Sequence, residues 1–491
     1  MKERLKNEKA EEVIKYVIEP SIKAELVRSF DNLMYVNKAH LKMIVETEII
    51  DRSIGREILR GLNELIDEGS NNLQIDYNIE ELYLNMEKAL IEKVGIKAGG
   101  ILHIGRSRND LLATVTRMNS RDSIFNILKK INILRNEILI IAKDNVETII
   151  SGYTHMQPAE PITLSHYLSA LLFAVERDFK RLIATYKQIN TSPLGAGSMG
   201  STNFNIDRDM TAEILEFDTV MNNSLDSIAS RDYSMEALSS LALYSNNLSR
   251  IAQDLYIWST DEFNYVEVDD SVSIGSSIMP QKKNPVTLEH IKAKAAHVLG
   301  AYVSTFSTLK NISYGHSRDT STESMKYYWD AFHEVESITS LMIATLRNIK
   351  FNKSLMRERT LENFTTVTEL ANTLVRKTDI SFRQAHHIVG FMVREMIEED
   401  IDLEQVNSEM VNKYARVVIG EDIIYSDKDV SISLDPEENV YSKTVKGGPA
   451  PSEVNRQLDE ISNNLEEDNI WLNTQVGRIE KMKMSLDTLQ L

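Results

Sequence analysis

Residues 124–141 read IFNILKKINILRNEILII, and their apolar side chains recur at alternating steps of three and four. One stripe contains Ile124, Ile127, Ile131, Leu134, Ile138 and Ile141, which is the spacing of a seam in a helical bundle. Leu128 and Leu139 add apolar surface on a second side. Because a helix that is apolar on two sides needs neighbours on both, this segment is expected to lie inside a bundle.

A second apolar stripe follows, and no glycine or proline interrupts it: Leu164, Leu168, Leu171, Val175, Phe179, Leu182 and Tyr186. Proline is also absent between Pro20 and Pro158 and between Pro285 and Pro436. These gaps permit long helices, since an interior proline costs about 3 kcal/mol. We expect an all-α chain with a central helical bundle at 111–360 and smaller helical domains at 1–110 and 361–491. Only the part near 420–450 looks irregular, with Ser431–Ser433 as a candidate short strand.

Composition limits the classes of function. The 491 residues contain 55 Lys plus Arg and 73 Asp plus Glu, a formal charge of −18, which argues against a general nucleic-acid binder. A small anionic substrate remains compatible, because a few placed cations set the local potential. Cysteine is absent, which excludes disulfides and thiolate catalysis. No apolar run approaches the roughly 20 residues of a membrane span. The charged start, Met1–Leu5, is unlike a secretion signal, so we expect a cytoplasmic protein.

Glycine and polar residues gather in four places between the apolar stretches. They are the Arg segment (99–110), the His segment (151–158), the Gly segment (192–202) and the Ser arm (271–285). Arginine forks suit a carboxylate, a histidine can act as acid or base, and glycine lets the backbone approach a ligand. A solvated loop, a structural histidine and a mobile surface loop remain alternative interpretations. The segments lack the spacing of a metal site or a phosphate-binding loop, and we expect neither metal nor cofactor.

Together the segments resemble the argininosuccinate lyase branch of the fumarase/aspartase superfamily. Gly275–Pro285, which reads GSSIMPQKKNP, is similar to the signature of the superfamily. More specific to the argininosuccinate branch are Leu102-His103 with Gly105–Asp110, and Gly152–His155. Further similar blocks are Pro193–Gly195 with Ile206–Arg208, Asn223–Asp226 with Arg231-Asp232, Phe382–His386 and Gly447–Pro451. The likeness runs from about residue 95 to about 460, and the first 40 residues match poorly.

The resemblance implies a fumarase/aspartase-like fold and a homotetramer whose long helices form one twenty-helix core. Each active site would be assembled from segments of three subunits. The expected partners are therefore a small anionic substrate and further copies of the chain, with neither nucleic acid nor a membrane.

The resemblance also implies a carbon–nitrogen lyase that releases fumarate from an N-substituted aspartate, most directly argininosuccinate, by base-catalysed β-elimination. Ser276 would be the base, and Lys282 and backbone N–H groups of the arm would stabilise its alkoxide. His155, paired with Glu289, would transfer the proton at the leaving nitrogen. The implied substrate-binding residues are His103, Ser107, Arg108, Asn109, Thr154, Gln157, Arg231, Ser277 and Asn284. For His103, Gln157, Arg231 and Lys283, a role in the scaffold remains equally open.

The likeness weakens on the amine side of the substrate. Residues 317–325 read SRDTSTESM, with Thr322 where arginine-making members have a glutamine. In the N-terminal loop that would reach the same end, only Ser21 and Glu25 can be aligned. A sister lyase acting on another N-succinyl amine, similar to ethylenediamine-disuccinate lyase, is therefore an alternative. A non-catalytic structural protein on the same fold is a further one, because the family is known to permit it.

Overall fold

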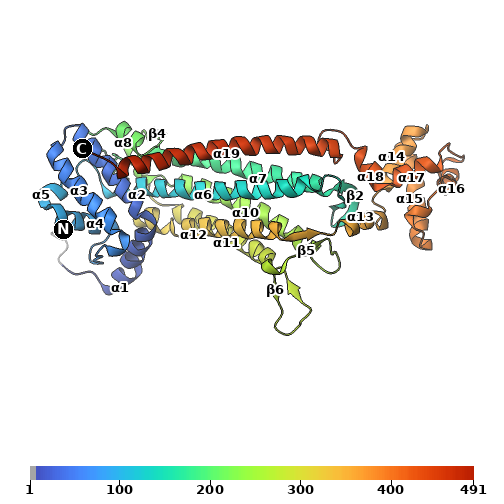
Figure 1. Ribbon diagram of the computed structural model, residues 1–491, viewed down its shortest axis with the longest axis horizontal. Coiled ribbons are helices and arrows are strands. Elements are labelled where there is room, and N and C mark those ends of the chain that lie inside the picture. The colour runs from blue at the N-terminus through green and yellow to red at the C-terminus, as the bar shows by residue number, and fades with distance from the viewer. Residues whose placement is uncertain (1–6) are drawn as a thin grey trace.

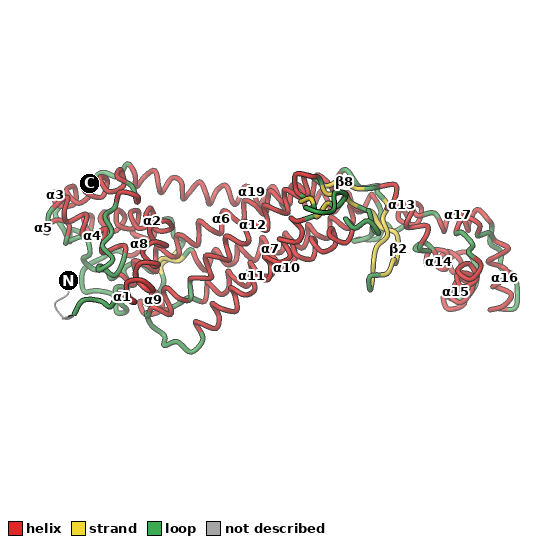
Figure 2. Tube along the Cα trace, turned by 90° about the horizontal axis from the view of Figure 1, so that it is seen from below, coloured by secondary structure: helices red, strands yellow, loops and turns green. Residues whose placement is uncertain are grey.

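The structure is a computed structural model that describes residues 7–491, so the charged start Met1–Leu5 lies outside the described residues. The chain forms a long rod in which helices run side by side along the long axis (Figure 1). The last helix ends beside the N-terminal helices, at one end of the rod (Figures 1 and 2). Within residues 7–491, every helix is too short or too polar to cross a membrane.

The centre of the rod is a bundle of long helices, as the apolar stripes predict. Its members are α6 (Arg108–Lys143), α7 (Leu164–Ile189), α10 (Asp232–Trp258), α11 (Val286–Leu309) and α12 (Lys326–Arg347). Helix α6 begins at a capping box between Ser107 and Asp110, and α7 begins at the Thr163 hydroxyl.

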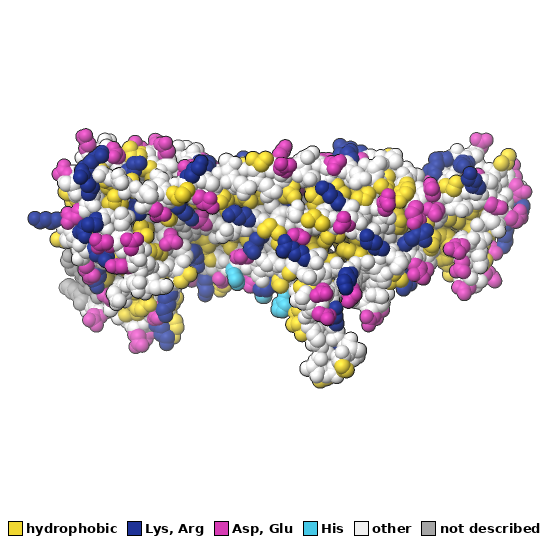
Figure 3. Space-filling view, viewed as in Figure 1, with side chains coloured by type: hydrophobic (Ala, Val, Ile, Leu, Met, Phe, Trp, Pro, Cys, Tyr) yellow, Lys and Arg dark blue, Asp and Glu magenta, His cyan; other side chains and the backbone are white. Residues whose placement is uncertain are grey.

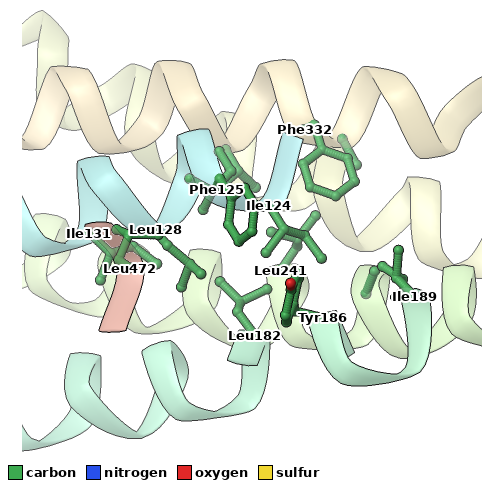
Figure 4. Close-up of a cluster of buried hydrophobic side chains, with 14 of the residues drawn as sticks. Ile124, Phe125, Leu128, Ile131, Leu182, Tyr186, Ile189, Leu241, Phe332 and Leu472 are labelled. Carbon is green, nitrogen blue, oxygen red and sulfur yellow. The ribbon is translucent and has the colours of Figure 1, made fainter. Parts of the chain in front are cut away.

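Residues from both predicted apolar sides of α6 are buried where this helix meets its neighbours. Ile124, Leu128 and Ile131 are each 0% exposed. Figure 4 shows them against side chains of the surrounding helices, which include Leu182, Tyr186, Leu241, Phe332 and Leu472. Burial of one such aliphatic side chain contributes about 1.5–3 kcal/mol. The two-sided stripe therefore fixes α6 in the interior of the bundle.

The final helix, α19 (Pro451–Asp487), returns along the outside of the bundle (Figure 1). It contributes Leu458, Ile461 and Leu465 to the same core as α6 and α7. We expected one C-terminal domain at 361–491, and the structure divides this range. Residues 370–434 have a separate apolar core, whereas α19 packs on the bundle.

Further helices, most of them shorter, form a unit at each end of the rod. The N-terminal unit contains α1 (Glu11–Val13), η1 (Ile14–Ile18), α2 (Glu19–Glu46), α3 (Arg52–Glu68), η2 (Ser70–Asn72), α4 (Leu82–Val94) and α5 (Ile96–Gly99). The opposite unit contains α13 (Lys353–Glu362), α14 (Val367–Lys377), α15 (Phe382–Glu399), η5 (Leu403–Gln405), α16 (Ser408–Ile419), α17 (Asp427–Leu434) and α18 (Pro436–Tyr441). The candidate strand at Ser431–Ser433 was wrong, because these residues lie inside α17.

The strands are short and lie in the connections between helices. Antiparallel pairs are β1 (Ile149–Thr154) with β2 (Gln157–Thr163), β5 (Val266–Val268) with β8 (Ile349–Phe351), and β6 (Ile274–Gly275) with β7 (Lys283–Asn284). A parallel pair joins β3 (Thr191–Ser192) and β4 (Thr219–Val220). The remaining short helices are α8 (Arg208–Ile214), α9 (Ser224–Ala229), η3 (Asp270–Val272) and η4 (Asp319–Glu323).

Candidate active site

The polar segments of one chain lie at three separate places along the rod. The Arg and Gly segments meet beside the N-terminal unit, near α5 and α8 (Figure 1). The Ser arm projects from the middle of the rod as the β6–β7 hairpin (Figures 1 and 3). The His segment forms part of the β1–β2 hairpin, toward the opposite unit.

Asp110 joins the Arg segment to the Gly segment. Its Oδ1 accepts a hydrogen bond from the Ser107 N–H at 2.9 Å, and its Oδ2 accepts from the Gly195 and Gly197 N–H groups, each at 2.9 Å. Burial raises the pKa of Asp110 to about 6, although these backbone donors oppose the rise. Gly195 has φ +82, and a Cβ there would lie 2.7 Å from Arg208 Cγ, so this close approach requires glycine.

Ser107, Arg108 and Asn109 form the first turn of α6. The Ser107 hydroxyl accepts a hydrogen bond from the Asn109 N–H at 3.4 Å, and the Asn109 amide donates to the Ser198 carbonyl at 3.0 Å. Backbone N–H groups at a helix start favour a negative ligand, and an arginine fork favours a carboxylate. The predicted binding residues Ser107, Arg108 and Asn109 are therefore grouped in a suitable place.

Arg108 donates to the buried carboxylate of Glu81, which also accepts from Arg318. Neither Glu81 nor Arg318 belongs to the four polar segments. Glu81 Oε1 accepts from Arg108 Nη1 at 2.7 Å and from Arg318 Nη2 at 2.6 Å. His316 lies among the same charges, and burial, together with Arg231, Arg108 and Arg318, lowers its pKa to about 4. Arg231 is buried and donates to the Ser230 carbonyl at 2.7 Å. Together these residues form a cationic region with one buried carboxylate.

His103 packs into the N-terminal unit. Its ring stacks on Tyr83 of α4, with ring centroids 5.4 Å apart. Burial and the nearby Arg106 lower the pKa of His103 to about 4, so the imidazole is neutral at pH 7. This contact agrees with the scaffold interpretation of His103, and a substrate contact stays a prediction.

His155 lies in the turn of the β1–β2 hairpin. His155 and Met156 have φ of 54 and 59, and the flanking Thr154 and Gln157 are paired. Thr154, His155, Met156 and Gln157 are all exposed. A cavity of about 680 Å³ lies behind the turn and is lined mainly by apolar side chains, including Trp258 and Phe263. His155 is thus exposed at the turn and also lines this cavity.

Within the described residues of one chain, no hydrogen bond or ion pair joins His155 to Glu289. Glu289 lies in the first turn of α11, and its Oε1 accepts from the Tyr256 hydroxyl at 3.3 Å. The predicted pair therefore requires His155 and Glu289 from different copies of the chain, or a rearrangement.

The Ser arm holds Ser276 in a tight turn. The Ser276 hydroxyl oxygen accepts from the Ile278 N–H at 3.3 Å and from the Met279 N–H at 3.0 Å, while the Ser276 N–H donates to the Lys282 carbonyl at 3.2 Å. Ile278 is 81% exposed, and Ser277 and Lys282 are also exposed. Lys283 instead pairs with Asp270 at 2.8 Å and Glu267 at 3.6 Å, which supports its role in the scaffold. Asn284, in β7, is partly buried.

A second cavity, of about 420 Å³, lies between α2, α6 and η4. The two residues aligned on the amine side, Ser21 and Glu25, line it together with Thr322. Arg318 and Arg28 also contribute, and the Arg28 guanidinium lies 4.4 Å from the centroid of the Trp329 ring. Glu81, Arg28 and His316 were not predicted, because no motif contains them. Arg318 had one signal, its place in the divergent 317–325 stretch.

Residues 9–300 match the family model described as "Lyase", and residues 364–441 match "Argininosuccinate lyase C-terminal". The chain is 47% identical over 465 residues to argininosuccinate lyase 1 of Shouchella clausii, covering 95% of this chain and 93% of that protein. It is 37% identical over 480 residues to the argininosuccinate lyase of Methanocaldococcus jannaschii, covering 98% and 97%.

Solved structures give the same fold. EDDS lyase in complex with formate has a TM-score of 0.85 at 31% identity, with 98% of this chain and 95% of that chain covered. A fumarate lyase from Mesorhizobium sp. BNC1 has a TM-score of 0.72 at 19% identity, with 90% and 97% covered, which supports the fold alone.

Proposed function

The chain belongs to the argininosuccinate lyase family of the fumarase/aspartase superfamily, and from this membership we propose that its Ser arm, His segment and Arg segment form one active site. The protein is a carbon–nitrogen lyase that releases fumarate from an N-substituted aspartate by β-elimination, with argininosuccinate as substrate and arginine as the second product. The single observation that carries the residue assignment is the environment of the Ser276 hydroxyl.

Two backbone N–H groups point at the Ser276 oxygen, from Ile278 and Met279. Preorganised donors of this kind stabilise negative charge and so reduce the cost of forming an alkoxide. The alkoxide removes a proton from the succinyl carbon next to a carboxylate, and the electron pair delocalises into that carboxylate. Lys282 follows on the same arm, and its ammonium adds positive charge once the arm closes over substrate and water leaves.

The carboxylate that gains charge must be held by fixed donors. Ser107, Arg108 and Asn109 supply a hydroxyl, a guanidinium and an amide at the start of α6. Residues from the other segments complete this part of the site: Thr154, Ser277 and Asn284. His103, Gln157 and Arg231 either contact the substrate or support these donors.

The amine leaves with the electrons of the carbon–nitrogen bond, and His155 donates a proton to that nitrogen. Glu289 fixes the imidazole tautomer and raises its basicity. His155 is exposed at a hairpin turn, which leaves it accessible to a Glu289 carboxylate from another copy.

The site is proposed to be shared among copies of the chain, in a homotetramer located in the cytoplasm. In one chain the three segments lie apart along the rod. Helix α11 carries an outward apolar row, Leu299, Val303 and Phe306, which are 55%, 54% and 48% exposed. A contiguous apolar face on a helix favours association with another copy, which would also bring distant segments together.

One observation favours the sister-lyase alternative. Thr322, which replaces the expected glutamine, lines the 420 Å³ cavity together with Ser21 and Glu25, so the amine side differs from arginine-making members. That alternative resembles EDDS lyase, whose structure this chain matches closely.

Fumarate absorbance during incubation with argininosuccinate tests the function. We expect fumarate release by the wild type, and Ser276→Ala should abolish it while the assembly persists in gel filtration. Release from another N-succinyl amine but not from argininosuccinate would select the sister lyase. No release from any member of such a panel would contradict the lyase function.

A further inference from the structure

We propose that Glu81 is a positioning residue, which holds Arg108 for the succinyl carboxylate and ties it to Arg318 on the amine side of the same site. The inference rests on the proposed function, because it takes Arg108 as a substrate ligand. Glu81 belongs to none of the four polar segments. It contributes through two other residues and has no assigned contact with substrate.

The Glu81 carboxylate is almost completely buried. Its side chain is 2% exposed, whereas those of Arg108 and Arg318 are 37% and 39% exposed. One oxygen, Oε1, receives both guanidinium groups, and Oε2 is buried without a hydrogen-bond partner among residues 7–491. A buried carboxylate is tolerated only when cations compensate it, so Glu81 and the two arginines depend on one another.

The contact joins three parts of the chain. Glu81 directly precedes α4 of the N-terminal unit, Arg108 opens α6, and Arg318 directly precedes η4. Arg318 also lines the 420 Å³ cavity, alongside Thr322. One carboxylate therefore fixes the succinyl-side arginine and the divergent amine-side segment at a set separation.

The remaining charges favour an anion next to this contact. Arg108, Arg231 and Arg318 all act electrostatically on His316, which is kept neutral. Glu81 and its neighbour Glu80, which also pairs with Lys9, offset these three guanidinium groups and that ammonium only in part. The ion pair with Glu81 thus orients the Arg108 guanidinium. The other N–H groups of Arg108 and a net positive field remain available for the substrate carboxylate.

Two variants separate the contributions of this contact. Glu81→Gln keeps the size of the side chain and removes its charge, so both arginines lose their anchor. Arg318→Gln removes only the contact between Glu81 and the arginine on the amine side. Because it replaces a partly exposed side chain, the fold should tolerate it. Glu80→Gln is the matched control for the direct contact, because Glu80 is the adjacent carboxylate, feels the charges of Arg108 and Arg318, and makes its ion pair with Lys9 at 2.9 Å instead.

Fumarate binding is measured by calorimetry, and KM and kcat are measured with argininosuccinate. Glu81→Gln should weaken fumarate binding and raise KM about tenfold, with kcat changed less than about threefold. Arg318→Gln should leave fumarate binding unchanged and raise KM about fivefold. The double variant should have the KM of Glu81→Gln alone, because both changes break one contact. Glu80→Gln should match the wild type.

Several results would overturn the proposal. Unchanged fumarate binding in Glu81→Gln would do so, as would an effect of equal size in Glu80→Gln. A double variant whose fold-increase in KM equals the product of the two single fold-increases would also overturn it. If Glu81→Gln does not fold, an unchanged KM in Arg318→Gln has the same meaning. A wild type that neither binds nor releases fumarate would instead contradict the proposed function. The contact is then judged by a double-mutant cycle in urea unfolding, where absence of coupling between Glu81 and Arg318 refutes it.

Discussion

Replacement of Glu25 by glutamine should change the pH dependence of both substrate binding and stability. Glu25 lines the 420 Å³ cavity where we expect the amine half, and its Oε1 accepts from the Ser21 hydroxyl at 3.2 Å. Burial, followed by the negative charge of Glu81, raises the pKa of Glu25 from 4.5 to about 7. The carboxyl group is therefore about half ionised near pH 7, and a cationic amine half needs its ionised form.

The effect on binding follows from the pKa of about 7. The ionised fraction is about one in eleven at pH 6 and about ten in eleven at pH 8. KM for a substrate with a cationic amine half should therefore be about tenfold higher at pH 6 than at pH 8. In Glu25→Gln this difference should disappear.

The effect on stability has the opposite sense. Since the pKa of Glu25 is higher in the folded state, the folded protein binds more protons than the unfolded chain between about pH 4.5 and about pH 7. Stability is thus lost as the pH rises through that window. The rise in pKa from 4.5 to about 7 corresponds to about 3–4 kcal/mol, and partial solvent exposure of the side chain reduces it to about 2 kcal/mol. Glu25→Gln should therefore be more stable than the wild type at pH 8 by about 2 kcal/mol.

The assays are initial rates of fumarate release and urea unfolding at pH 6, 7 and 8. Glu19→Gln is the matched control, because Glu19 lies on the same helix, pairs with Lys23 at 2.6 Å and does not line the cavity. A wild-type KM that is constant from pH 6 to pH 8, or a Glu25→Gln variant that keeps the wild-type pH dependence, would refute the reasoning.

Three further predictions concern the frame of the site. Asp110→Asn removes one of two accepting oxygens and leaves buried backbone N–H groups unpaired. Urea unfolding should therefore show a free energy of unfolding lower by about 2–4 kcal/mol. An unchanged midpoint would contradict the assigned hydrogen bonds. Gly195→Ala, at φ +82, should cost about 1–3 kcal/mol in the same assay, whereas Gly200→Ala, which meets open space, should change stability by less than about 0.5 kcal/mol. Val303→Glu places a charge on the outward face of α11, so sedimentation velocity should show a smaller species with little activity; an oligomer of wild-type mass would argue against that face as the interface.

The long helices could be predicted because their signal is local. The steps of three and four from Ile124 to Ile141 describe one face of one helix, and all that is needed to find them is the spacing. The path of α19 could not be predicted in this way. Its apolar residues, such as Leu458 and Leu465, require a neighbour but do not identify it. At Ser431–Ser433 a brief alternation was misleading, although Ser426 and Asp429 already formed the capping pattern that starts α17.

The chemistry of the site was more visible in the sequence than its geometry. The Ser arm and the Arg segment are contiguous motifs, so Ser276 and Arg108 could be selected directly. The structure makes the His segment part of a hairpin, which its sequence does not predict, because His155 and Met156 adopt positive φ without the usual turn residues. Glu81 and Arg318 are 237 positions apart, and their contact depends on the folded arrangement of three units.

The path of α19 has a consequence for biosynthesis of the chain. Every residue with a proposed chemical role precedes Ala450, yet Leu458, Ile461 and Leu465, which complete the core, are translated afterwards. A nascent chain can therefore have all its catalytic residues outside the ribosome while the apolar surface that α19 will cover is still exposed. That surface stays exposed until the last few dozen codons are translated. A premature stop in that region would therefore spare the reaction machinery and still yield an aggregating product, a loss of function whose cause no inspection of catalytic motifs would reveal.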